Sequence, residues 1–129
     1  MENPTELKYS KEHEWVKVEG DIAIVGVTDF AQEQLTDIVF VELPEVGKKV
    51  EAKKGMAVIE SVKSVSDVFS PVNGEVVEAN VKLSDSPEII NKDPYGEGWL
   101  AKIKIEDSSA LDGMMSSEEY GNFVKEEKH

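Results

Sequence analysis

The chain has 129 residues, of which 40% are hydrophobic, and it contains no cysteine. This length predicts a single domain over residues 1–129, and the lack of thiols excludes disulfide bonds, thiolate metal sites and a cysteine nucleophile. All 14 basic residues are lysines and they face 27 acidic residues, so the net charge is −13, which argues against nucleic-acid binding.

Charge and hydropathy also bear on partners and location. An acidic surface keeps a protein soluble, and it steers the protein toward partners with basic patches. No apolar run approaches the ~20 residues of a membrane span. The N-terminal residues 1–9 lack the apolar core of a signal peptide. We therefore expect a cytoplasmic protein without a membrane partner.

Short strands separated by turn residues occupy most of the chain. In chain order, the predicted strands are residues 15–18, 22–27, 37–43, 50–52, 56–61, 64–69, 75–81 and 99–105. Glycine or proline stands at most of the turns between them, and Asn73-Gly74 is the strongest turn signal. This pattern predicts a mainly β fold, either an antiparallel sandwich or a small barrel.

Helix formers interrupt the strands in a few places. The predicted helices are residues 29–35, 86–91, 110–115 and 117–125. The first has Thr28 or Asp29 as its N-cap, and the second is a single turn capped by Ser86. The last begins with Ser116 and Glu119 in a capping-box spacing. Short helices, including C-terminal ones, should therefore accompany the sheets.

Groups typical of catalytic sites are scarce. Of the two histidines, His129 is the terminal residue, so His13 is the one candidate for a general base, and a lone histidine is more often structural. No glycine-rich phosphate loop precedes a helix, and no set of side chains has metal-ligand spacing. Composition therefore favours a protein that is not an enzyme.

The segment around Lys63 breaks the turn pattern. Two predicted strands meet at Val62-Lys63 without glycine, asparagine, aspartate or proline, although a two-residue hairpin normally requires positive φ. Either this turn is strained for a function, or the predicted strand boundaries are wrong by two residues. Since Gly55 and Gly74 mark flanking turns, Lys63 should project one amine from a rigid tip.

The chemistry of that amine favours modification over catalysis. A free lysine amine is almost entirely protonated at neutral pH, and a lysine nucleophile needs burial or a neighbouring cation. The charges near Lys63 are those of Glu60 and Asp67, which favour the ammonium form. Lys63 is therefore predicted to be acylated by a separate enzyme that supplies the activation.

Several segments resemble the H protein of the glycine cleavage system. They are residues 13–16, 27–32, 37–44, 60–63, 70–76 and 91–99, and the resemblance extends from Tyr9 to about Val124. Glu60-Ser61-Val62-Lys63 is specific to this family among lipoyl carriers. Biotin carriers typically flank the lysine with methionines, and lipoyl domains of 2-oxoacid dehydrogenases carry Asp-Lys-Ala-like tips.

The resemblance implies a small antiparallel barrel-sandwich hybrid of the lipoyl/biotinyl-carrier type, with lipoate in amide linkage to Lys63. It implies a carrier that takes the aminomethyl group of glycine from a pyridoxal-phosphate glycine decarboxylase to a tetrahydrofolate-dependent aminomethyltransferase. Dihydrolipoamide dehydrogenase would reoxidise the arm, and a lipoate-attaching enzyme would recognise the tip at Glu60, Ser61 and Val62. The cofactor supplies the chemistry, and the protein supplies tethering and recognition.

The resemblance further implies that the loaded arm folds into a surface cleft that excludes water. The positions matching this cleft are Glu14 and Asp67, whose carboxylates suit the cationic amine of the arm. Two positions depart from the family pattern. Glu12 replaces a smaller polar residue found in some relatives, and Thr36 replaces the usual glycine after the short helix, which would ease a left-handed helix end.

Two other functions share the Lys63 tip. One is a lipoyl relay that donates lipoate to other lipoate-dependent enzymes, and the sequence does not separate it from the carrier. The other is an enzyme that uses Lys63 as a Schiff-base nucleophile. Trapping of a carbonyl substrate on Lys63 with borohydride would identify that enzyme.

Overall fold

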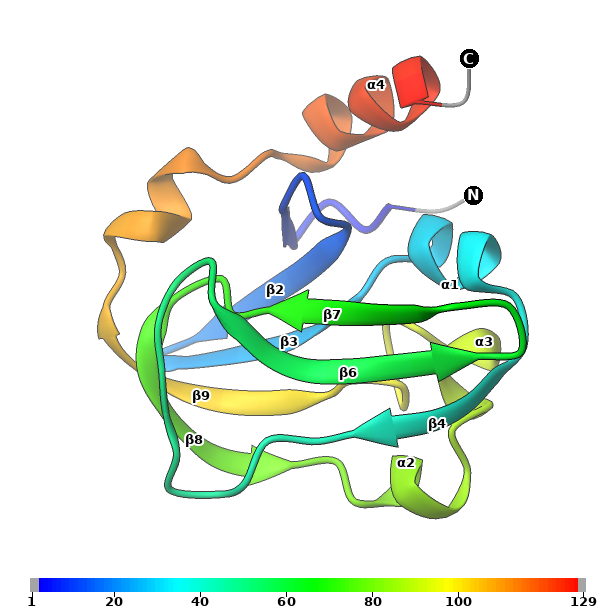
Figure 1. The fold of residues 1–129 in the computed structure, drawn as a ribbon. Helices are drawn as coiled ribbons and strands as arrows, with labels where there is room; N and C mark the ends of the chain where they lie inside the picture. Colours follow the sequence, from blue (N-terminus) through cyan, green and yellow to red (C-terminus); the bar gives the residue numbers. More distant parts are fainter. Residues whose placement is uncertain (1–2, 128–129) are drawn as a thin grey trace.

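The computed structural model describes residues 3–127 and shows a mainly β protein with two antiparallel sheets (Figure 1). The strands are β1 (Lys8–Tyr9), β2 (Glu14–Glu19), β3 (Ile22–Val27), β4 (Ile38–Glu42), β5 (Lys49–Val50), β6 (Gly55–Ser61), β7 (Val65–Phe69), β8 (Asn73–Ala79) and β9 (Ala101–Asp107). The larger sheet has the order β1-β2-β3-β9-β8-β5, and the smaller has the order β4-β6-β7. The predicted mainly β antiparallel fold is confirmed.

The main hydrophobic core lies between the sheets. Val25 and Ile103 enter it from the larger sheet, and Ile59 and Val68 enter it from the smaller one. Ile59, Val25 and Ile103 are fully buried. Burying such side chains stabilises the fold by about 1.5–3 kcal/mol each. This core makes the β6–β7 hairpin a rigid support for whatever its tip presents.

Short helices flank the sheets. They are α1 (Asp29–Leu35), α2 (Lys82–Asp85), α3 (Ile89–Lys92), the 3₁₀ helix η1 (Ser109–Gly113) and α4 (Ser117–Glu127). The capping box of α4 is confirmed, since the Ser116 N–H donates to Glu119 Oε1 at 2.9 Å and the Glu119 N–H donates to Ser116 Oγ at 3.2 Å. No helix within residues 3–127 is long and apolar enough to cross a membrane.

A second hydrophobic cluster joins the two ends of the chain. Tyr9 and Trp15 meet Phe30 of α1 and Tyr120 of α4 there. The Tyr9 and Tyr120 rings stack with centroids 4.7 Å apart. In Figure 1, α4 crosses above β2 and near α1. The C-terminal helix is therefore packed against the body of the protein.

The turn predicted over residues 71–74 lies at Pro71-Val72, where the chain bends, and its predicted centre at Asn73-Gly74 is wrong, because both residues begin β8. The Asn73 side chain accepts a hydrogen bond from the Ala52 N–H at 2.9 Å, which replaces the turn role of asparagine. A Cβ on Gly74 would lie 2.2 Å from the Lys104 carbonyl oxygen. Glycine is needed there for the close approach of β9, not for a positive φ.

Other boundaries moved by a few residues. The strands predicted at 50–52, 75–81 and 99–105 are β5, β8 and β9. The helical turn predicted at 86–91 is α3, where no side chain caps the N-terminus. The helix predicted at 110–115 is the 3₁₀ helix η1, which ends at Gly113, and Met115 forms a β-bridge with Tyr9 instead. Strand β1 and helix α2 were not predicted, because two residues and a single turn leave no periodic signal.

Candidate functional site

The tip of the β6–β7 hairpin is closed by the side chain of Ser61. Its Oγ accepts hydrogen bonds from the Lys63 N–H at 3.1 Å and the Ser64 N–H at 3.0 Å. The Ser61 N–H donates to the Ser64 carbonyl at 2.8 Å. A buried serine hydroxyl therefore takes the place of the glycine or asparagine expected in a tight hairpin.

The two explanations offered for the unusual Val62-Lys63 turn can both be tested against the structure. Strand β6 ends at Ser61, as predicted, and β7 begins at Val65, one residue later than predicted, so the boundaries at the tip are not wrong by two residues. Among the described residues, the non-glycine residues with positive φ are His13, Thr36 and Lys53. The idea of a strained tip is wrong, because a Ser61-capped turn needs no left-handed residue.

The tip rests on the C-terminal end of α1. The Val62 N–H donates to the Asp37 carbonyl at 3.0 Å, and Lys63 Nζ donates to the Gln34 carbonyl at 3.2 Å. Helix C-termini expose carbonyls and partial negative charge, which suit an ammonium group. Lys63 is nevertheless exposed, so one weak contact holds its amine while the rest of the side chain faces solvent.

Helix α1 ends at a left-handed residue despite the absence of glycine. Thr36 has φ 63° and ψ −145°, and its N–H donates to the Gln32 carbonyl at 3.0 Å. This backbone region is essentially restricted to glycine. Asn91 Nδ2 donates to the Thr36 carbonyl at 2.8 Å and ties α3 to this end. Thr36 therefore adopts, at this helix end, a positive-φ backbone that a glycine would ease.

A cleft of about 780 Å³ opens beside the start of β2. Glu12 and Glu14 line it together with Phe69 at the end of β7. Its other lining residues include the apolar Tyr9, Pro71, Met114 and Met115 and the basic Lys11 and Lys53. The cleft therefore combines an apolar wall with carboxylates.

Glu14 is buried and fully hydrogen-bonded, with 3% of its surface exposed. Its Oε1 accepts from Ser10 Oγ at 2.7 Å and its Oε2 accepts from the Phe69 N–H at 2.9 Å. Burial raises the pKa of the Glu14 carboxyl to about 7, although both hydrogen bonds oppose that rise. Near neutral pH this carboxyl is therefore partly protonated, and a cation placed beside it would favour the carboxylate.

A second cleft, of about 490 Å³, lies between α1 and the loop that precedes β2. Gln34, whose carbonyl contacts the Lys63 amine, lines it together with Leu35, and Ser66 of β7 lines it from the hairpin. Glu12 lines both clefts. Because they share Glu12, the two clefts are neighbours, the smaller lined by Gln34 beside the Lys63 amine and the larger lined by Glu14.

The two predicted cleft residues are placed differently. Glu14 lies inside the larger cleft, whereas Asp67 is exposed on β7 and is not among the residues that line it. Alternate residues of a strand share a face, so Asp67 and Phe69 point to the same side of β7. Asp67 therefore stands outside the cleft, two residues along the strand from its wall.

Exposed apolar side chains surround the tip, and the sequence reading missed them. Val62, Val65 and Phe40 are all largely exposed. Phe40 pairs with Glu60 across β4 and β6, and Glu60 pairs with Val65 across β6 and β7. Phe40, Glu60 and Val65 therefore lie on one face of the sheet. In the sequence, Phe40 and Val65 are ordinary strand residues by type. Only the sheet pairing shows that they lie together beside the tip.

Comparisons with known proteins agree with the resemblance seen in the sequence. The profile of the family described as Glycine cleavage H-protein matches residues 7–127. A glycine cleavage system H protein of Coprothermobacter proteolyticus is 62% identical over 121 residues, covering 93% of this chain and 95% of the relative. Another, of Halothermothrix orenii, is 56% identical over 126 residues, covering 98% of each chain.

A solved structure gives the same result in three dimensions. The crystal structure of a glycine cleavage system H protein from Mycobacterium marinum superposes with a TM-score of 0.87 at 38% sequence identity. The match covers 95% of this chain and 98% of the other. Sequence and fold are therefore similar over nearly the whole length.

Proposed function

Because this chain belongs to the glycine cleavage H-protein family, we propose that it is a carrier, as a single domain, with a lipoyl group in amide linkage on Lys63. The observation that carries this proposal is the exposed Lys63 on a turn that Ser61 holds without strain. An attaching enzyme needs an amine that it can surround, and a rigid tip presents one at little entropic cost. An exposed lysine also lacks the desolvation that a Schiff-base nucleophile requires, so the carrier is favoured over that enzyme.

The residues around Lys63 fit a lipoyl arm. When bound on Lys63, the group would supply a disulfide able to take up the aminomethyl unit that remains after glycine loses CO2. Leu35 and Phe30 offer apolar contact in the smaller cleft, and Phe69 does so in the larger one. Glu14 can hold a cationic amine by a charge-assisted hydrogen bond, and Asp67 adds negative charge nearby.

Recognition of the tip falls to the side chains beside Lys63. Glu60 and Val62 are exposed, while Ser61 is buried and acts through the backbone shape of the turn. Phe40 and Val65 extend the exposed surface on either side of Glu60. We assign this surface to contact with the decarboxylase, the aminomethyltransferase, dihydrolipoamide dehydrogenase and the lipoate-attaching enzyme. The net charge of −13 favours basic surfaces on these partners.

Intact-mass spectrometry tests the attachment. After expression in a lipoate-replete host, the protein should carry one lipoyl adduct, and Lys63→Arg should carry none, because a guanidinium is not acylated in this way. Lys54→Arg is the matched control, since Lys54 is an exposed lysine just before the opposite end of β6 and should leave the adduct intact. The modified protein should then gain an aminomethyl unit from glycine and glycine decarboxylase. An unmodified or biotinylated wild-type chain would refute the proposal.

A further inference from the structure

The loop between β1 and β2 has an uncommon backbone. His13 has φ 69°, a left-handed conformation that costs an ordinary residue roughly 1–2 kcal/mol. Its N–H donates to the Ser10 carbonyl at 3.1 Å, and the Ser10 N–H donates to the Glu14 carbonyl at 2.9 Å. This tight loop carries Glu12 and leads directly into Glu14, so its shape decides where both carboxylates lie.

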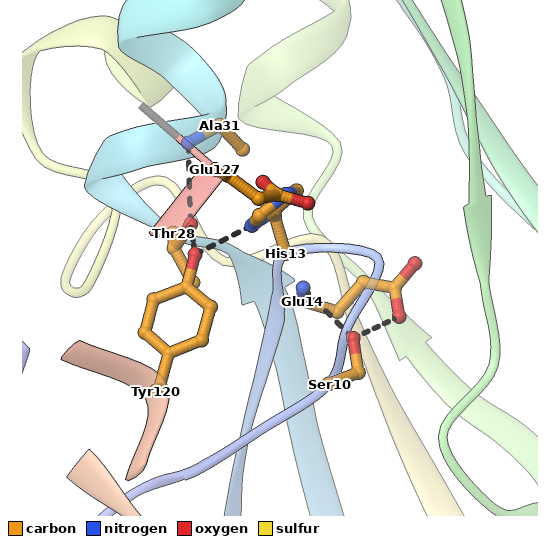
Figure 2. Close-up of polar contacts among 7 residues, drawn as sticks. All are labelled: Ser10, His13, Glu14, Thr28, Ala31, Tyr120 and Glu127. Carbon is orange, nitrogen blue, oxygen red and sulfur yellow. Dashed lines mark hydrogen bonds and ion pairs between the residues drawn. The ribbon is translucent and has the colours of Figure 1, made fainter. Parts of the chain in front are cut away.

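The imidazole of His13 is held on both nitrogens by α4. Nδ1 lies 2.8 Å from the Tyr120 hydroxyl, and Nε2 lies 2.8 Å from Glu127 Oε2 (Figure 2). The ring also packs against Phe30, with centroids 4.7 Å apart. A side chain fixed at two polar atoms and one face has little freedom left, although 19% of it stays exposed.

The group that holds His13 is itself anchored. The Tyr120 hydroxyl lies 2.7 Å from Thr28 Oγ1, which accepts the Ala31 N–H at 3.2 Å as the N-cap of α1 (Figure 2). Burial raises the pKa of the Tyr120 hydroxyl, so it keeps its proton. With Nε2–H donating to Glu127, Tyr120 donates to Nδ1 and Thr28 donates to Tyr120. Each side chain in this series of hydrogen bonds then has both a suitable donor or acceptor and a partner for it.

This polar chain borders the smaller cleft. His13 and Glu127 line the smaller cleft, together with Gln34, whose carbonyl accepts from the Lys63 amine. The next residue of the loop, Glu14, lines the larger cleft. The end of α4 thus lines the smaller cleft, and the loop that it holds carries Glu12, which lines both clefts.

We propose that His13 is a positioning residue for the resting place of the arm, clamped by Tyr120 and Glu127 of α4. The clamp holds the left-handed backbone at His13 and so keeps Glu14 buried and facing the cleft. The inference rests on the proposed function for the identity of the occupant. It adds that the C-terminal helix, far from the tip in sequence, determines the geometry of the cleft.

Two substitutions release the clamp and leave Glu12 and Glu14, the cleft carboxylates of the β1–β2 loop, in place. Tyr120→Phe deletes the hydroxyl that bridges His13 and Thr28 and keeps the ring that stacks on Tyr9. Glu127→Gln weakens the contact with Nε2, and Glu126→Gln is its matched control, because Glu126 is an exposed neighbour on α4. Val124→Ala loosens the packing of α4 and leaves the polar chain intact.

The first readout needs no lipoyl group. In unmodified protein, carbon-detected NMR should place the titration midpoint of the Glu14 carboxyl near pH 7. Tyr120→Phe should lower that midpoint by about one pH unit, because a loosened loop admits water to the carboxylate. Val124→Ala should leave it in place. An unchanged midpoint in Tyr120→Phe, or an equal shift in Val124→Ala, would overturn the proposal.

The second readout uses lipoylated, aminomethyl-loaded protein freed of its enzymes. Tyr120→Phe should lose the aminomethyl group to water about five- to tenfold faster than the wild type, a change equivalent to one net hydrogen bond. Glu127→Gln should show a smaller increase, and Glu126→Gln none. Equal rates for Tyr120→Phe and the wild type would contradict the clamp. A wild type that is never lipoylated would instead refute the proposed function and leave the Glu14 titration to decide on the clamp.

Discussion

The hairpin tip and the β1–β2 loop place their functional candidates oppositely, one exposed and one buried, but side-chain hydrogen bonds hold both segments in shape. Lys63 is exposed on a turn without backbone strain, which the buried hydroxyl of Ser61 closes. Glu14 is buried beside a loop with a left-handed residue, which side chains from a distant helix hold in place. Under the proposed function, Lys63 has to be reached by other enzymes, which requires exposure and a rigid base. Under the same proposal, Glu14 receives a cation away from water, which requires burial and therefore support from residues distant in sequence.

The largest expected difference between the two regions concerns pH. Because burial raises the pKa of Glu14 to about 7 from the model-compound value of 4.5, its protonated form is the one that folding favours. Protonated Glu14 therefore makes its full contribution to the free energy of unfolding below pH 4.5. This contribution, about 3 kcal/mol in all, is lost as the pH rises through 7.

Glu14→Gln tests that contribution, because glutamine resembles the protonated acid. Its oxygen can accept from the Phe69 N–H while its amide donates to Ser10 Oγ. In urea unfolding of unmodified protein, the free energy of unfolding of this variant, relative to that of the wild type, should rise by up to about 3 kcal/mol between pH 4.5 and pH 8. Glu51→Gln, at an exposed turn, should follow the wild-type pH curve. A Glu14→Gln curve parallel to that of the wild type would show that Glu14 titrates normally.

The next effect concerns the tip. Ser61→Ala removes the acceptor of the Lys63 and Ser64 N–H groups and should lower the free energy of unfolding by about 1–2 kcal/mol. Amide exchange at Ser64 should accelerate, and lipoylation should slow because the tip is no longer fixed. Ser84→Ala, at an exposed position on α2, serves as the control. Unaltered exchange at Ser64 would mean that the turn does not depend on the hydroxyl.

The smallest effect concerns the support beneath the tip. Thr36→Gly should stabilise the protein by about 1 kcal/mol, because glycine adopts φ 63° and ψ −145° without the strain of a β-branched side chain. Thermal unfolding measures the gain, with Lys53→Gly, at φ 69°, as a comparison that lacks the β-branch. A loss of stability in Thr36→Gly would show that the Thr36 side chain contributes more than its backbone costs.

The sequence by itself determined the fold class, the Lys63 tip and the capping box of α4. Each depends on local patterns: strand composition, turn residues, and a serine three residues before a glutamate. Local patterns also misplaced one turn, because the need for Gly74 comes from the carbonyl of Lys104, on a strand thirty residues away.

Only the tertiary structure decided how the site is assembled. Glu14 was named from resemblance, yet its raised pKa comes from burial in the folded protein, while the hydrogen bonds from Ser10 and from the Phe69 N–H of the other sheet hold its oxygens and oppose that rise. The same holds for His13, which looked like an ordinary structural histidine until packing brought Tyr120 and Glu127 to its two nitrogens. Desolvation and hydrogen bonding act through space, so residues more than a hundred positions apart set the chemistry of one loop.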